Sequence, residues 1–203
     1  MQDEIGRGLV NQDKFPLAVK TDEFSPLVKF AAPFGILELH ADPVLPVSVR
    51  NVEKNLAAAT VGYPAKTINI NSKSTPKEII EYYRIVNDKD WGYGDEPRRT
   101  RGASVFADLR SAKSFQVPRP GTDRDFELVG IPLKEPGLHI VEVQSPRLGE
   151  ALLEGGTMYV ASAALVTNLS VHFKRGRDSS LVWVTTLDKA QVVASAEVSI
   201  LDG

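Results

Sequence analysis

The feature that most constrains this chain is a series of short apolar runs separated by turn dipeptides. Asp42-Pro43, Pro120-Gly121, Pro136-Gly137 and Gly155-Gly156 are turn signals that stand between runs rich in Val, Ile and Leu. Runs of this length with this spacing favour strands over helices. The seven strand candidates here are residues 35–40, 44–52, 66–71, 115–118, 126–133, 138–144 and 158–167.

One segment among these runs predicts a helix. Thr75 is suited to an N-cap, Pro76 to the first helical position, and Glu78 to returning a hydrogen bond to the cap. Apolar and aromatic residues then follow at helical spacing, and the helix is expected to end within residues 87–90. The polar, glycine-rich residues 91–99 predict a long exposed loop.

Together these elements predict an all-β fold. Seven strands with one inserted helix are typical of a fibronectin-III-like or immunoglobulin-like sandwich, which would occupy residues 34–167. Residues 1–33 contain Phe15-Pro16 and Ser25-Pro26 and have no sustained period. They are therefore expected to be a leading, connecting segment.

Residues 168–203 repeat the strand pattern, with strands expected at 169–174, 181–187 and 196–201. Val171 and Phe173 fall on one face of the first of these, and Ser170, His172 and Lys174 fall on the other. Three strands cannot close a sandwich. They either pack on the first unit, pack on a neighbouring molecule, or begin a second domain.

Composition removes several classes of function. The 203 residues include no cysteine, which excludes disulfides, thiolate metal sites and cysteine nucleophiles. The net charge is −2, so a nucleic acid or an anionic membrane would need a local basic patch. The clusters at residues 98–101 and 174–177 have acidic neighbours, which indicates solvated loop charges instead. Neither an export signal at the N-terminus nor a membrane span is predicted.

A search for catalytic or ligating patterns identifies no site. His40, His139 and His172 all lie in predicted strands and are too far apart in sequence for a local metal site. There is no G-x-S-x-G elbow. Asp88 and Asp90 begin like a calcium loop, but the pattern fails after them. We therefore expect no catalytic, cofactor-binding or metal-binding residue, no cofactor, and no enzymatic activity.

A second class of function is kept open. Trp91 and Tyr93 lie in the glycine-rich loop, and exposed aromatic residues are frequent anchors at binding surfaces. On this alternative, the chain is a fibronectin-like adhesion module that binds carbohydrate or protein through the loop at 91–101.

Three stretches resemble the bacterial α2-macroglobulin family. They read GLHIVEVQSPRLG at 137–149, AALVTNLSVHFK at 163–174 and GRDSSLVWVTTLD at 176–188. A fourth, PLVKFAAPFG at 26–35, is similar to a stretch that precedes this region in the family. The resemblance is strongest over residues 137–188.

The resemblance implies a macroglobulin-like sandwich at 34–167 and the N-terminal part of a second such domain at 168–203, from the amino-terminal half of a larger protein. Such proteins are periplasmic, often lipoproteins anchored to the inner membrane, and are thought to trap proteases as broad-spectrum endopeptidase inhibitors. Many carry a thioester built on a cysteine, which this chain lacks. The implied partners are neighbouring macroglobulin-like domains, target proteases of the parent protein, and other copies of the chain through strand pairing.

Overall fold

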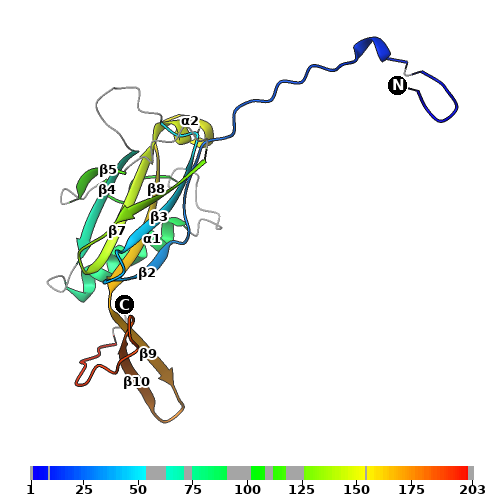
Figure 1. Cartoon of the computed structure of the whole chain (residues 1–203). Coiled ribbons are helices and arrows are strands. Elements are labelled where there is room, and N and C mark those ends of the chain that lie inside the picture. The colour runs from blue at the N-terminus through cyan, green and yellow to red at the C-terminus, as the bar shows by residue number, and fades with distance from the viewer. Residues whose placement is uncertain are drawn as a thin grey trace.

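A computed structural model describes residues 2–8, 10–53, 63–70, 75–90, 102–107, 112–117, 126–153 and 155–200. Figure 1 shows a β-rich body with an extended N-terminal arm on one side and a β-hairpin at the other end. The arm holds one short 3-10 helix, η1 (Gln12–Lys14). Among the described helices, none combines the length and the apolar character needed to cross a membrane.

The smaller sheet has three antiparallel strands in the order β1-β3-β6. These are β1 (Leu27–Phe30), β3 (Val44–Arg50) and β6 (Phe126–Pro132). Burial alternates residue by residue along β3 and β6, because one face of the sheet is covered and the other faces solvent.

The larger sheet has the order β2-β8-β7-β4-β5. Its strands are β2 (Phe34–Glu38), β4 (Tyr63–Ile70), β5 (Lys113–Val117), β7 (Gly137–Ser145) and β8 (Met158–Thr167). All neighbours are antiparallel except β2 and β8, which run parallel. The chain passes from β1 in one sheet to β2 in the other through residues 31–33, where Ser162 Oγ donates to the Ala32 carbonyl oxygen at 2.9 Å.

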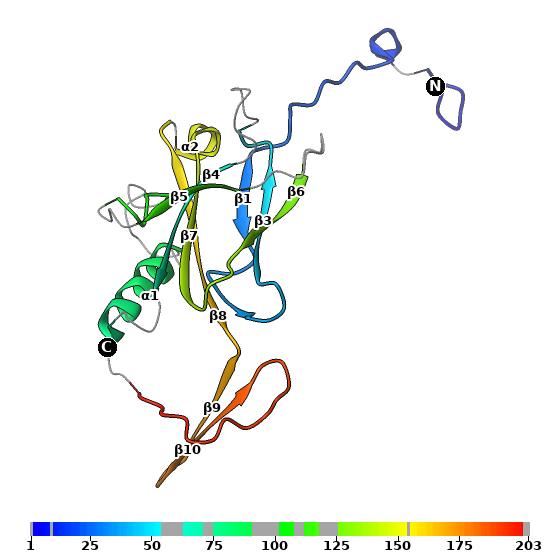
Figure 2. The ribbon, with the colours of Figure 1, turned by 60° about the vertical axis from the view of Figure 1, so that its left-hand side comes forward.

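β7 is buried on both faces, so the body has three layers. Val141 and Val143 belong to the core between the two sheets. Leu138 and Ile140, on the opposite face, belong to a second core that includes Phe106 of the 102–107 segment. α1 (Pro76–Asp90) covers this outer face, and Figure 2 shows it on the side of the larger sheet away from β1, β3 and β6.

The N-terminus of α1 is capped as the sequence predicts. The Thr75 backbone N donates to Glu78 Oε2 at 2.7 Å, and the Glu78 backbone N donates to Thr75 Oγ1 at 3.3 Å. This reciprocal arrangement satisfies two backbone donors that a helix start otherwise leaves open. The end of α1 at Asp90 also confirms the expected boundary.

A second helix, α2 (Pro146–Leu153), was not expected from the sequence. Ser145 Oγ accepts a hydrogen bond from the Leu148 backbone N at 3.0 Å and donates to Glu53 Oε1 at 3.0 Å. Glu53 Oε1 also accepts from the Arg147 backbone N. The carboxylate that completes this cap therefore comes from a residue 92 positions earlier, which no local pattern can reveal.

The all-β class is confirmed, with three corrections of detail. The two sheets together hold eight strands, because β1 lies within residues 1–33, which were expected to be only a connecting segment. Val28 and Phe30 are buried in the core, which explains why this segment forms a strand. α2 is the second correction. The third is that residues 196–200, expected to lie in a strand, form none.

The body is followed by an antiparallel hairpin of β9 (Leu169–Arg175) and β10 (Ser180–Thr186). Val171 pairs with Val184, and His172 pairs with Trp183. Because the side chains of paired residues share a face, the apolar face and the mixed face expected for β9 are both present in the hairpin.

The close packing of α2 on the start of β8 generates a stability prediction. A Cβ at Gly149 would clash with the Gly156 carbonyl oxygen and would lie 2.7 Å from the Met158 backbone N. Since both are backbone atoms, α2 has to move. We expect Gly149→Ala to lower the free energy of unfolding by about 1–3 kcal/mol, measured by urea denaturation followed by circular dichroism.

The matched control is Gly35→Ala, because a Cβ at Gly35 has nothing within 4 Å. The control is expected to stay close to the wild type. Equal stabilities of the two variants would contradict the packing described for α2.

Candidate functional site: the joint between the body and the hairpin

The described residues contain no group of three or more His, Asp or Glu side chains arranged to hold a metal ion. The three histidines are in separate places. His139 in β7 is buried, with Nε2 2.7 Å from the Glu135 carbonyl oxygen. His172 in β9 stacks on Trp183, with ring centroids 5.0 Å apart. His40 lies in the turn after β2, not in the strand predicted for it, because β2 ends at Glu38.

A polar network surrounds Asn168, the one residue between β8 and β9. Asn168 Oδ1 accepts hydrogen bonds from the backbone N of Leu187 and of Asp188, both at 3.1 Å. The Leu187 backbone N also donates to the Asn168 carbonyl oxygen at 2.9 Å. A single side chain thus fastens the end of β10 to the start of β9.

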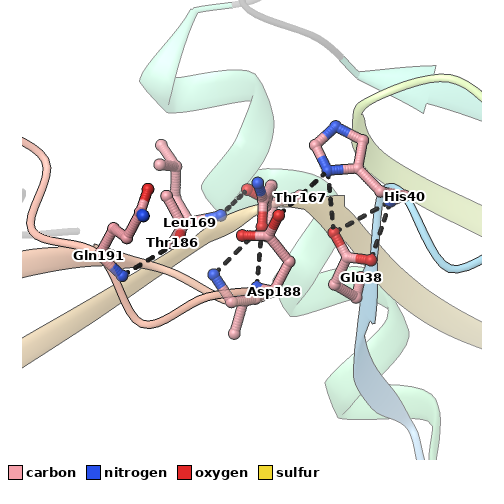
Figure 3. A network of polar contacts seen from close by, with 9 residues as sticks. Glu38, His40, Thr167, Leu169, Thr186, Asp188 and Gln191 are labelled. Atoms are coloured by element: carbon pink, nitrogen blue, oxygen red, sulfur yellow. Dashed lines mark hydrogen bonds and ion pairs between the residues drawn. The ribbon is translucent and has the colours of Figure 1, made fainter.

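The body attaches to the same point through Thr167. Its carbonyl oxygen accepts a hydrogen bond from the Leu39 backbone N at 3.2 Å, and its Oγ1 accepts one from the Leu169 backbone N at 3.0 Å. Since β2 and β8 are parallel, they end at the same edge of the larger sheet, and the turn after β2 meets the hairpin there. Figure 3 shows Glu38 and His40 facing Asp188 and Thr167 across this joint.

Charged groups complete the joint. The His40 backbone N donates to both carboxylate oxygens of Glu38 at 2.9 Å. His40 Nδ1 lies 3.5 Å from Glu38 Oε1 and 3.8 Å from Asp188 Oδ2. The pKa of the Asp188 carboxyl is below its ordinary value, first because the Thr186 side chain donates to it, and then because of Asn168 and the charge of Lys189.

The backbone hydrogen bonds, rather than these charges, fix the geometry of the joint. The side chain of His40 is 59% exposed, and exposed ion pairs contribute little in water. Asn168 is partly buried and satisfies two backbone donors, which makes its amide the group with the largest structural effect. The arrangement can orient two β units.

The sequence reasoning missed buried Glu142 and half-buried Glu53, and the carboxylates of both act as structural anchors. Glu142 in β7 accepts hydrogen bonds from Ser104 Oγ at 2.8 Å and from the Val105 backbone N, holding the 102–107 segment on the sheet. Glu53 caps α2. A Glu inside the apolar run at 138–144 was the available signal for Glu142, because an acidic residue in a buried strand requires donors.

The basic cluster at 174–177 is exposed on the hairpin. The loop at 91–101, with Trp91 and Tyr93, lies outside the described residues, as does the basic cluster at 98–101. Asp88 and Asp90 lie in the last turn of α1, which is a helix and not the loop that calcium binding would need.

The amide of Asn168 provides a test of the joint. We expect Asn168→Ala to speed hydrogen exchange of the Asp188 amide by roughly tenfold, the effect of losing about 1–2 kcal/mol of hydrogen bonding. The Leu187 amide should change less, since it keeps the Asn168 carbonyl oxygen. Exchange measured by NMR provides both rates in one experiment.

Gln191→Ala is the matched control, because Gln191 is in the same turn and takes part through its backbone N, which donates to Thr186 Oγ1 at 3.2 Å. Unchanged protection of the Asp188 amide in Asn168→Ala would show that Asn168 does not hold the joint.

No family model matches the chain, and no curated protein sequence matches it. Two solved structures are similar to it, both of native α2-macroglobulin from Escherichia coli. The structure that spans domains MG0-NIE-MG1 is 15% identical, with a TM-score of 0.48, over 86% of this chain and 50% of that one. This chain therefore spans about half the length of that structure.

The structure that spans domains NIE-MG1 is 13% identical, with a TM-score of 0.50, over 85% of this chain and 75% of that one. At this identity the likeness concerns the fold. The chain thus shares its β-sandwich fold with the NIE-MG1 fragment of a bacterial α2-macroglobulin.

Proposed function

We propose that the chain is a non-catalytic structural part of a bacterial α2-macroglobulin-like inhibitor that traps proteases. The observation that carries the proposal is the fold likeness over 85% of the chain to a fragment of two consecutive domains. The sequence resemblance over residues 137–188 supports it independently, because it includes the last strands of the body and the whole hairpin.

The surface of the hairpin supports a second domain that begins at residue 168. Leu169, Val171 and Phe173 lie on one face of β9 and are 48%, 58% and 53% exposed. A row of apolar side chains on one face is typical of a sheet that packs against another. We propose that further strands of a macroglobulin-like domain cover this face in the parent protein.

The joint suits a role in the wall of a cage. Asn168 is the only residue between β8 and β9, and both units contribute hydrogen bonds around it. A connection this short and this well bonded restricts rotation between the two units. We propose neighbouring macroglobulin-like domains and target proteases as partners of the parent protein, in the periplasm and with an inner-membrane anchor.

The test uses the protein that contains this chain, incubated with trypsin. Trapping predicts that cleavage of a large protein substrate falls while cleavage of a small peptide substrate continues, since only the small substrate reaches an enclosed protease. Cleavage of both substrates at the uninhibited rate would contradict the proposal.

The joint variants connect this test to the structure. Asn168→Ala should reduce the protection of the large substrate, whereas Gln191→Ala should leave it at the wild-type level. If both variants protect the large substrate equally well, the joint has no role in trapping. That result would not affect the family proposal.

Strand pairing between copies is a second prediction. Backbone hydrogen bonds from residues 191–193 cover the edge of β10 that faces away from β9. One of them runs from the Val193 backbone N to the Val184 carbonyl oxygen at 2.9 Å. In the described part of the chain, β9 pairs only with β10, so its other edge is open. We propose that two copies of the chain pair through this edge.

Sedimentation velocity at increasing concentration should show a dimer that Val171→Lys abolishes, because an added charge on the edge strand opposes pairing. Lys174→Arg, which keeps the charge on the same strand, is the control. A monomer at every concentration would contradict this prediction.

A further inference from the structure

A cavity of about 380 Å³ lies between α1 and the outer face of the larger sheet. Its described walls come from β2, β7, β8 and α1. They consist of five apolar side chains and one cationic side chain: Phe34, Leu138, Leu165, Ile79, Ile80 and Arg84. Cavities that hold small molecules are of this size and are lined mainly by apolar groups.

The apolar walls of the cavity are incompletely covered. Phe34 and Leu165 are only partly buried, although they pack against the second core. Ile79 is 38% exposed. An apolar ligand that filled the cavity would remove this surface from water, which is a favourable term for binding.

Arg84 supplies the polar end of the site. It follows Ile80 by one helical turn, so the two side chains lie on the same side of α1. Arg84 is exposed, and it makes no ion pair or hydrogen bond with any residue in the part of the chain that the structure describes. An arginine whose stem lies along an apolar wall can present its guanidinium at the opening.

Of the acidic side chains that the structure describes on α1, neither Glu78 nor Glu81 pairs with this guanidinium. Glu78 is engaged in the N-cap with Thr75. Neither Glu78 nor Glu81 is among the described residues that line the cavity. A carboxylate at the opening could therefore form two parallel hydrogen bonds with the Arg84 guanidinium.

We propose that this cavity binds a medium-chain fatty acid, with the alkyl chain between α1 and strands β7 and β8 and the carboxylate paired with Arg84. The apolar walls match an unbranched chain, and the single cation matches a single negative head. This inference does not depend on the proposed function. The cavity lies on the face of the larger sheet that α1 covers, whereas the smaller sheet covers the other face.

The experiment is calorimetric titration of the whole chain with laurate below its micelle-forming concentration, and with dodecanol as the uncharged ligand of equal chain length. We expect one saturable laurate site and at least tenfold weaker dodecanol binding, the effect of a charged hydrogen bond of about 1.5–3 kcal/mol. The absence of saturable laurate binding would overturn the proposal.

Variants locate the site. Arg84→Gln should weaken laurate about tenfold and leave dodecanol unchanged, whereas Lys77→Gln, which removes an exposed cation from the same helix away from the cavity, should change neither. Ile80→Trp should fill the cavity and abolish binding of both ligands. Ile79→Phe provides a smaller obstruction if the tryptophan variant does not fold, as judged by circular dichroism.

The apolar face of the hairpin is the competing place for a fatty acid to bind. Phe173→Ser removes the largest exposed side chain of that face and should leave laurate affinity unchanged. A loss of binding in Phe173→Ser, or wild-type binding in both Ile80→Trp and Ile79→Phe, would place the ligand outside the cavity and overturn the proposal.

Discussion

The burial of β7 on both faces is the constraint on which the rest of the body depends. Val141 and Val143 on one face and Leu138 and Ile140 on the other face must both be shielded from water. A two-layer sandwich would shield only one of these faces. The smaller sheet provides the first cover, and α1 with the 102–107 segment provides the second. Glu142 is tolerated in the middle of β7 because Ser104 and Val105 meet its carboxylate with donors.

The sequence predicted the parts of this architecture that depend on local patterns. Strand positions followed from apolar runs between turns, and α1 followed from the reciprocal cap of Thr75 and Glu78. β1 was missed because four residues between prolines and alanines are too short to show a period. α2 was missed because its capping carboxylate, Glu53, is distant in the sequence, although Ser145-Pro146 was a usable local signal.

The contacts that make up the joint could not have been predicted from the sequence. No local pattern marks Asn168, because its partners, Leu187 and Asp188, are brought to it by the hairpin register. His40 was placed in a strand, whereas the structure places it in the turn that faces Asp188. Such contacts depend on which strand ends share an edge, and that information is present only in the sheet topology. The cavity beneath α1 likewise depends on how the helix is placed over β2, β7 and β8.

The parallel pairing of β2 with β8 has a mechanical consequence. A force that pulls on the hairpin acts along β8, which is hydrogen-bonded to β7 on one side and to β2 on the other. Most of these bonds lie across the direction of pull, so they are loaded together in shear and do not open one after another. β8 can therefore carry tension from a neighbouring unit into the centre of the larger sheet, and the body would resist extension more strongly than a sheet pulled apart from its edge.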